Sequence, residues 1–549
     1  MSGPLSKRLA ANRRRLTRTR RRVALSGALL LSVVATALVP ATATADTTGG
    51  TGAAAGATAT ASGGPTVTTR YGQVEGKRGE TAHSYLGIPY AAPPVGTRRW
   101  KPPSPPERWP GVRDATAPGN PCMQSADQST PWGNLAGPGT PSEDCLYLNV
   151  HTPAERSLRK RPVMVWIHGG GFTVGSGTFY DGSELAARGD VVNVTLNYRL
   201  GAFGYLAHPG LAEESARGLS GNYGLLDQQA ALRWVRDNIA AFGGDPDEVT
   251  VFGESAGGGS VCQNLVSPRA AGLFDRAVAQ SGCGFPLPTQ ESQQNSGAAW
   301  AKSLDCADVA CLRGRPADQV LTASLRPNAR WVPNVDGEVL PLQVPDALEQ
   351  GRFHRVPVLQ GTTADEGRLT VAGSYDLAGR QLTAEGYPPA VRAIYGDRAE
   401  AILARYPLSD HGSPAEALGA VFTDSQFACL QSRTAELMAE HTRSYQYEFA
   451  DPHAMDHLNL PVSFPLGAPH GSEIRYVFGG VEGTPAQNAL ADAMLGYWTN
   501  FAKTGVPYAG DAPRWHLFPK VQTLAPEGIT GSTTFPRDHQ CDLWNEPAS

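Results

Sequence analysis

The chain has 549 residues and a formal charge of −4 at pH 7, with 47 basic and 51 acidic side chains. Hydrophobic residues make up 41% and charged residues 18%, a balance typical of folded globular proteins and not of disordered ones. Nine basic residues lie within the first 45 positions, so the remaining chain has 38 basic and 51 acidic side chains and a net charge of −13. An acidic body without a basic stripe excludes nucleic acid as an expected partner.

The first 45 residues have the pattern of an export signal. Three adjacent arginines at 20–22 precede an apolar run over 23–39, and the small residues ATATA at 41–45 offer an A-x-A cleavage site before Asp46. A retained membrane anchor is the alternative, but the run is near the lower limit for crossing a bilayer and contains Ser26, Ser32 and Thr36. We predict that residues 1–45 are a signal peptide, and that the mature protein is secreted and not membrane-bound.

Residues 46–65 (DTTGGTGAAAGATATASGGP) have almost no large apolar side chain. Such a composition buries too little surface to offset the entropy of ordering, so we predict a flexible linker. The folded body is expected to begin at Thr66 and to run to Ser549 as one domain, because no composition break divides it.

The body alternates short β-branched runs with helical periodicity. Residues 225–239 repeat apolar side chains with the 3.6-residue period of a helix, and 444–449 (SYQYEF) alternates as a strand nearer an edge would. Central strands are predicted at 163–167 (VMVWI), 191–197 (VVNVTLN), 249–252 (VTVF), 276–280 (RAVAQ) and 356–360 (VPVLQ). This order predicts an α/β fold: a large, mostly parallel central sheet with helices on both faces and functional loops at the carboxyl ends of the strands.

Two glycine-rich turns follow predicted buried strands. His168–Phe172 (HGGGF) follows VMVWI, and its glycines expose backbone N–H groups that can receive an oxyanion. Gly253–Gly257 (GESAG) is a G-x-S-x-G motif directly after VTVF. A serine on such a sharp strand-to-helix turn has its hydroxyl pushed clear of the sheet. Together the two motifs predict that Ser255 is a nucleophile and that backbone N–H groups stabilise the oxyanion formed when it attacks the substrate.

A nucleophilic serine needs a base, and the base needs an orienting acid. Asp365 and Glu366 both follow the strand VPVLQ, and their types and position do not rank them. His470 is the best placed base, since it follows a loop rich in proline and glycine and precedes a helical pattern. The candidates downstream of the last predicted strand are His453, His457, His470, His516 and His539.

Eight cysteines in an exported chain suggest disulfides. Cys306 and Cys311 would close a short local loop, and spacing alone does not decide the other pairings. Zinc is one alternative, but the chain has no C-x-x-C or clustered Cys/His spacing, so no metal site is expected. Unpaired cysteines buried as small apolar residues are the other alternative.

The sequence closely resembles the type-B carboxylesterase family of α/β-hydrolases, which includes the cholinesterases and bacterial para-nitrobenzyl esterases. The resemblance extends over nearly the whole body. It is carried by these blocks in the family's order: Gly87–Gly96 (GIPYAAPPVG), Ser142–Val150 (SEDCLYLNV), His168–Phe172 (HGGGF), Asn197–Leu206 (NYRLGAFGYL), Phe242–Gly257 (FGGDPDEVTVFGESAG), Gln280–Gly282 (QSG), Ala364–Gly367 (ADEG), His470–Gly479 (HGSEIRYVFG) and Tyr497–Gly505 (YWTNFAKTG).

The resemblance implies an α/β-hydrolase fold with long loop insertions and a role for each matched residue. Ser255 would be the nucleophile, Glu366 the acid and His470 the base. The implied oxyanion donors are the amides of Gly170, Gly171 and Ala256, and the residues implied near the catalytic histidine are Glu254 and Ser281.

The resemblance also implies disulfide pairs. Cys122 would join Cys145, and Cys429 would join Cys541. Cys306 with Cys311 resembles the family's short loop, although the spacing here is tighter. Cys262 and Cys283 are left as a fourth pair.

The expected activity is hydrolysis of a small-molecule carboxylic ester through a Ser-His-Glu triad and an acyl-enzyme, with no metal or organic cofactor. A thioester, amide, carbamate or polyester substrate is one alternative, because the motifs set the reaction and not the leaving group. A non-catalytic binding module is another, and the presence of all three triad residues argues against it.

Overall fold

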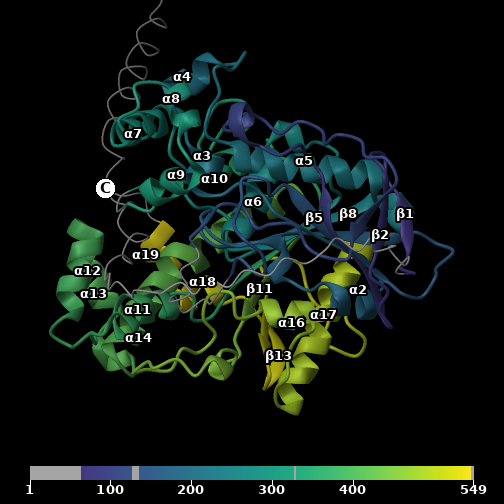
Figure 1. Ribbon diagram of the computed structural model, residues 1–549. Coiled ribbons are helices and arrows are strands. Elements are labelled where there is room, and N and C mark those ends of the chain that lie inside the picture. Colours follow the sequence, from purple (N-terminus) through teal and green to yellow (C-terminus); the bar gives the residue numbers. More distant parts are fainter. Residues whose placement is uncertain (1–62, 126–134, 327–328, 546–549) are drawn as a thin grey trace, which may run out of the picture.

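The computed structural model describes residues 63–125, 135–326 and 329–545 of the chain (Figure 1). The predicted signal peptide (1–45) and the predicted linker up to residue 62 lie outside the described residues.

A ten-stranded sheet runs through the molecule, and a three-stranded sheet flanks it. The large sheet has the order β13 (Gly528–Ser532), β12 (Val521–Ala525), β11 (Ser444–Phe449), β10 (Val358–Thr363), β9 (Arg276–Gln280), β8 (Gly244–Glu254), β6 (Arg161–Ile167), β7 (Val192–Leu196), β5 (Tyr147–Pro153) and β3 (Ala82–Pro89). The small sheet has the order β1 (Thr66–Thr68), β2 (Gln73–Gly76) and β4 (Val112–Ala115).

The large sheet is parallel from β12 through β7 and antiparallel at its ends, where β13 pairs with β12 and β3 and β5 complete the other side. The predicted mostly parallel sheet and the α/β fold are therefore confirmed. All five predicted central strands are present, although the strand at 356–360 begins two residues later, at Val358. The strand expected nearer an edge, β11, lies between β10 and β12, and most of its side chains are buried.

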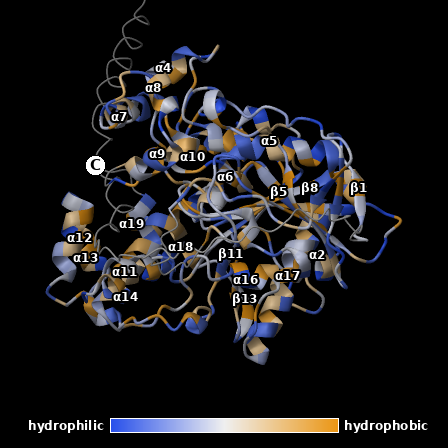
Figure 2. Cartoon of the chain, in the orientation of Figure 1, coloured by the Kyte–Doolittle hydropathy of each residue, from blue (hydrophilic) through white to orange (hydrophobic). Residues whose placement is uncertain are grey.

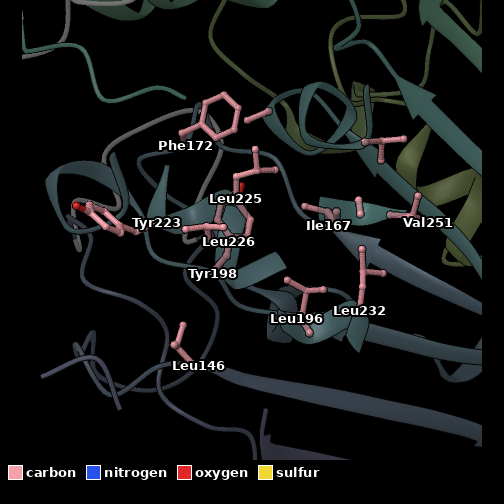
Figure 3. Packing of buried hydrophobic residues seen from close by; sticks show 14 of the residues in the cluster. Leu146, Ile167, Phe172, Leu196, Tyr198, Tyr223, Leu225, Leu226, Leu232 and Val251 are labelled. Atoms are coloured by element: carbon pink, nitrogen blue, oxygen red, sulfur yellow. The ribbon is translucent and has the colours of Figure 1, made fainter. Parts of the chain in front are cut away.

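Both faces of the sheet are covered by helices. Along β6, Val163, Val165 and Ile167 join one buried cluster, whereas Met164 and Trp166 join another. This alternation follows from the two-residue period of a strand, and burial on both faces explains why β6 reads as an uninterrupted apolar run. Figure 3 shows Ile167 and Val251 on the first of these faces, together with side chains of the helix that covers it.

The covering helices sit on opposite sides of the sheet in Figure 1. On one side lie α5 (Tyr223–Asn238) and α6 (Ala256–Val266), and on the other lie α2 (Ser183–Gly189), α16 (Ile474–Phe478) and α17 (Pro485–Thr504). The predicted helix at 225–239 is α5. Along α5 and α17, hydrophilic and hydrophobic residues alternate, as expected of helices with one face on the core (Figure 2), whereas every residue of α6 is buried.

Long insertions between the strands form further helices. The helices of the insertion after β10, drawn in green in Figure 1, pack around a third buried cluster. The insertion helices are α3 (Gly201–Tyr205), α4 (Pro209–Glu213), α7 (Gln290–Lys302), α8 (Val309–Gly314), α9 (Ala317–Ser324), α10 (Val344–Glu349), α11 (Arg368–Ser374), α12 (Tyr387–Tyr395), α13 (Ala399–Arg405), α14 (Pro414–Phe422), a π-helical turn (Thr423–Ala428) and α15 (Cys429–Ala439), and α18 (Phe535–Asp538) and α19 (Cys541–Asn545) end the described chain. None of the helices in the described parts of the chain has the length and hydropathy needed to cross a membrane.

Four disulfides cross-link the described chain, over sequence separations from 5 to 112 residues. The bonded pairs are the same as those expected from the sequence: Cys122–Cys145, Cys262–Cys283, Cys306–Cys311 and Cys429–Cys541. No cysteine in the described residues is free. The Cys262–Cys283 disulfide connects α6 to the segment that follows β9. Cys262 lies soon after Ser255 in the sequence, and Cys283 soon after Ser281.

Candidate active site

Ser255 lies in a tight turn between β8 and α6. Its backbone has φ 58° and ψ −123°, a strained conformation for a residue with a side chain. The turn packs so closely on β6 that a Cβ on Gly257 would lie 2.0 Å from the Ile167 carbonyl oxygen, and one on Gly253 would lie 2.5 Å from it. Glycine at these two positions is therefore what lets the turn press against the sheet and leaves the Ser255 hydroxyl at its tip.

The backbone of Ser255 is held on both sides. Its N–H donates to the Gln280 carbonyl at 2.9 Å, and its carbonyl accepts from the Gly259 N–H at 2.8 Å. Gly282 packs against the same carbonyl, since a Cβ there would lie 2.1 Å from the Ser255 oxygen. The end of β9 and the first turn of α6 thus fix the position of the predicted nucleophile.

The structure brings His470 and Glu366 together. The His470 Nδ1 donates to Glu366 Oε2 at 2.5 Å, and the other carboxylate oxygen accepts from the Thr363 N–H at 2.9 Å. Glu366 is fully buried, whereas the His470 side chain keeps 19% of its surface exposed. The Phe427 ring packs on His470, with 4.9 Å between the ring centres. A buried, doubly bonded carboxylate therefore orients an imidazole that remains accessible from the surface.

The other nitrogen of His470 faces Glu254, the residue before Ser255. Its Nε2 lies 3.1 Å from Glu254 Oε1. Within the described residues, no hydrogen bond links the Ser255 hydroxyl to His470. Hydrogen bonds between nucleophile and base are often long or poorly aligned in unliganded enzymes and tighten in the complex with substrate.

The two adjacent carboxylates after β10 point in different directions. Asp365 accepts from the Ala468 N–H at 2.9 Å and pairs with Arg368 at 2.9 Å, and only Glu366 reaches His470. Both residues lie in the turn at 364–367 between β10 and α11, so this turn, and not the alternation of an extended strand, directs the two side chains to different partners.

The carboxylates around His470 shift its proton affinity. Burial opposes the charged imidazolium, but the carboxylates of Glu254 and Glu366 outweigh it and raise the pKa of His470 to about 10. Burial also raises the pKa of Glu254 to about 8, against the attraction of His470. Because Glu254 Oε1 and His470 Nε2 lie 3.1 Å apart, the protonation of each group depends on the charge of the other.

A third carboxylate, Glu473, was not among the predicted site residues. It is fully buried, and its Oε1 accepts from the Gln280 side-chain amide at 3.0 Å and from the Tyr447 hydroxyl at 3.4 Å. Burial and the nearby Glu366 raise the pKa of Glu473 to about 7. Its position three residues after His470, at the start of α16, was the only signal for it in the sequence.

The remaining candidate histidines have other partners or none that bear on Ser255. His539 is held between Asp424 at 2.6 Å and Glu448 at 2.8 Å, and both of its ring nitrogens are occupied there. His453 contacts Asp456, and His457 contacts Arg475. Only His470 among the five reaches a carboxylate next to Ser255.

The predicted oxyanion turn lies beside the serine. Gly170 and Gly171 have φ values of 97° and 62°, which suit glycine. The Gly170 carbonyl accepts from the N–H groups of Thr173 and Val174 at 3.0 and 3.1 Å. In the described residues, the N–H groups of Gly170 and Gly171 donate to no backbone acceptor. Ala256, whose amide is the third predicted donor, begins α6 next to Ser255.

Ser281 follows β9 with a left-handed backbone, and its N–H donates to the Gly361 carbonyl at 2.8 Å. Its hydroxyl is buried and has no hydrogen-bond partner among the described residues, so it makes no hydrogen bond to His470. Nor do the described residues contain a group of three or more His, Cys, Asp and Glu side chains arranged to hold a metal ion.

Comparisons with known proteins place this chain in a family. The profile of the carboxylesterase family matches residues 63–544. Fumonisin B1 esterase of Sphingopyxis macrogoltabida is 39% identical over 476 residues, covering 82% of this chain and 84% of that protein. Para-nitrobenzyl esterase of Bacillus subtilis is 39% identical over 477 residues, covering 82% of this chain and 92% of that one.

Solved structures agree with the sequence relatives. A structure of PNB esterase superposes with a TM-score of 0.75 at 35% identity, over 88% of this chain and 99% of that one. The fold is therefore that of the α/β-hydrolases, as the resemblance implied. With a family profile spanning the described body and esterase relatives matched over most of their length, this chain belongs to the carboxylesterase family and is a carboxylic ester hydrolase.

Proposed function

We propose that the chain hydrolyses carboxylic esters through a triad of Ser255, His470 and Glu366. The observation that carries the proposal is the buried Glu366 carboxylate 2.5 Å from His470 Nδ1, which leaves Nε2 facing the turn that holds Ser255. A carboxylate bound to Nδ1–H keeps the imidazole in the tautomer whose Nε2 accepts a proton, and it stabilises the imidazolium that forms.

In the first step His470 removes the Ser255 hydroxyl proton as the serine oxygen attacks the ester carbonyl carbon. The carbonyl oxygen becomes a tetrahedral oxyanion, which the amides of Gly170, Gly171 and Ala256 receive. Collapse of this intermediate breaks the bond to the alcohol oxygen, and His470 gives its proton to the departing alcohol. The acyl group remains bonded to Ser255.

In the second step His470 removes a proton from water, which attacks the acyl carbon. A second oxyanion forms at the same amides and collapses with cleavage of the bond between the acyl carbon and the Ser255 oxygen, and His470 returns its proton to that oxygen as the carboxylic acid leaves. Glu254 faces His470 Nε2 from the residue before the nucleophile, so its proton and charge set how readily His470 acts as the base.

The proposed substrates are small-molecule esters, and the proposed location is outside the cell. The names of the relatives, an esterase for fumonisin B1 and one for para-nitrobenzyl esters, support the first point. The N-terminal signal pattern and four disulfides support the second, because disulfides persist in oxidising compartments.

The test is Ser255→Ala with a phosphonate serine probe and a nitrophenyl ester. We expect the wild-type protein to take up one probe per chain, and the variant to take up none while kcat falls by about 10⁴-fold. Ser292→Ala, on the exposed face of α7, is the control and should behave as wild type. Retention of more than about a tenth of the activity in Ser255→Ala would exclude the proposed nucleophile.

A further inference from the structure

His168 directly follows β6 and begins the glycine turn in the interior of the protein. The residue is fully buried. Its ring stacks on Tyr198 with 4.4 Å between ring centres and 21° between planes, and the Tyr198 hydroxyl donates to the His168 carbonyl at 2.9 Å. Tyr198 belongs to the hydrophobic cluster drawn in Figure 3. The imidazole is therefore held rigidly at the base of the turn.

The two ring nitrogens of His168 have different surroundings. Nδ1 lies 2.8 Å from the Gly169 carbonyl oxygen, while Nε2 is buried with no hydrogen-bond partner among the described residues. A carbonyl oxygen only accepts, so Nδ1 carries the hydrogen. Burial lowers the pKa of His168 to about 4, which keeps the ring neutral. One tautomer thus places a donor on Gly169, at the cost of an unpaired nitrogen lone pair.

The Gly169 carbonyl and the Gly170 N–H belong to the same peptide unit. In a trans peptide these two groups point in opposite directions. A donor that holds the Gly169 oxygen therefore also sets the direction of the Gly170 N–H, on the side away from the ring. A Cβ on Gly169 would lie 2.8 Å from the Glu254 carbonyl oxygen, so the turn passes directly beside the residue before Ser255.

The other two expected oxyanion donors are aimed in the same way, but by backbone groups. The Gly170 carbonyl accepts from Thr173 and Val174, which fixes the peptide that carries the Gly171 N–H. The Ser255 carbonyl accepts from the Gly259 N–H, which fixes the peptide that carries the Ala256 N–H. For the Gly169 carbonyl, the described residues offer one hydrogen-bond donor, and that donor is His168 Nδ1.

We propose that His168 is a positioning residue for ester hydrolysis: its Nδ1–H holds the Gly169–Gly170 peptide so that the Gly170 N–H points at the oxyanion. The inference rests on the proposed function, in which Gly170 is an oxyanion donor. If the ring only packed on Tyr198, any side chain of the same size would serve equally well. A positioning role instead requires a hydrogen-bond donor at the place of Nδ1, so substitutions that keep or remove this donor distinguish the two roles.

The substitutions His168→Asn and His168→Leu distinguish a positioning role from a packing role. The side-chain nitrogen of asparagine can occupy the place of Nδ1, so His168→Asn keeps a donor for the Gly169 carbonyl. His168→Leu keeps an apolar side chain and removes the donor. His168→Gln, whose nitrogen matches the place of Nε2, is polar and displaces the donor, and it stands in for the leucine variant if that variant does not fold. Thermal unfolding of each variant identifies the folded ones.

The measurements are kcat and KM for a nitrophenyl ester, and the affinity for a trifluoromethyl ketone that forms a tetrahedral adduct. We expect His168→Leu and His168→Gln to lose tenfold or more in kcat, below the about 10²- to 10³-fold cost of removing an oxyanion donor outright, with KM nearly unchanged. Affinity for the ketone should fall by the same factor as kcat/KM. His168→Asn should stay within about fivefold of wild type in both measurements.

Equal losses of kcat in folded His168→Asn and His168→Leu would overturn the positioning role while leaving the proposed function intact. A loss that appears in KM alone, with ketone affinity unchanged relative to substrate, would also overturn it. Full activity in Ser255→Ala would overturn both the proposed function and this inference.

Discussion

At the scale of single residues, two carboxylates contact the His470 imidazole, one at each ring nitrogen, and they have different roles. Glu366 is fully buried and binds Nδ1, whereas Glu254 faces Nε2, the nitrogen that exchanges a proton with Ser255 in the proposed mechanism. One carboxylate orients the ring, and the other influences when the ring is neutral. Each role leads to a separate prediction.

The first prediction compares Glu366→Gln with Asp365→Asn. Glutamine keeps the size of Glu366 but removes the charge that stabilises the imidazolium, so kcat should fall by on the order of 10²- to 10⁴-fold. Asp365→Asn weakens the contact with Arg368, so it should lower the free energy of unfolding by on the order of 1 kcal/mol and change kcat less. The two variants are compared at equal folded fraction. A larger loss of kcat in Asp365→Asn would reverse the assignment of the acid.

The second prediction concerns the pH dependence. The carboxylates of Glu254 and Glu366 raise the pKa of His470, and only the neutral imidazole acts as the base. Glu254→Gln removes one of these charges, so the pKa of His470 should fall and the acidic limb of kcat/KM should move to lower pH by about 1 to 2 units. The profile is measured with an uncharged ester from about pH 6 to about pH 11, a range that contains the pKa of about 10 expected for His470. A limb that stays in place, or moves to higher pH, would contradict this account.

At the scale of secondary-structure elements, the turn between β8 and α6 depends on the absence of side chains. The third prediction is that Gly257→Ala lowers the free energy of unfolding by about 1 to 3 kcal/mol, because its Cβ would lie 2.0 Å from the rigid Ile167 carbonyl. The displaced turn should also reduce kcat by on the order of 10²-fold.

Gly373→Ala provides the matched control. Gly373 also lies in a helix, α11, and a Cβ there has nothing within 4 Å. This substitution should raise the free energy of unfolding by about 0.5 to 1 kcal/mol and leave kcat unchanged. Denaturant titration of both variants, with kcat measured on the same samples, checks the pair. Similar effects at the two positions would show that close packing of the turn on β6 is not the cause.

At the scale of the whole molecule, the disulfides constrain loops of very different length. Cys429 and Cys541 are 112 residues apart and join the end of the chain to α15, whereas Cys306 and Cys311 are 5 residues apart. The fourth prediction is that replacing the first pair by alanine costs about 5 kcal/mol of unfolding free energy, and replacing the second pair costs about 2 kcal/mol, since loop-closure entropy grows with loop length. Denaturant unfolding of the two double variants measures both values. The reverse order would show that native-state contacts outweigh the entropy of the unfolded chain.

The sequence predicted much of this architecture because the information is local. Buried parallel strands read as short β-branched runs, so all five central strands were located, and the glycine turns after β6 and β8 were recognised by composition and order. β11 was expected nearer an edge because its residues alternate, yet β12 and β13 lie beyond it. That pairing depends on segments about 70 residues away in the sequence, which a local pattern does not contain.

By itself, the sequence determined the order of the elements, the turn that carries Ser255 and, through resemblance, the family of the chain. Only the tertiary structure decided which residues meet. It separated Glu366 from Asp365, placed Glu254 on His470 Nε2, added the buried Glu473 and oriented His168 toward the Gly169 carbonyl. The physical reason is that hydrogen bonds and pKa values depend on distances of a few ångströms between side chains that lie up to about 200 residues apart in the chain, and those distances exist only once the sheet has brought its strand ends together.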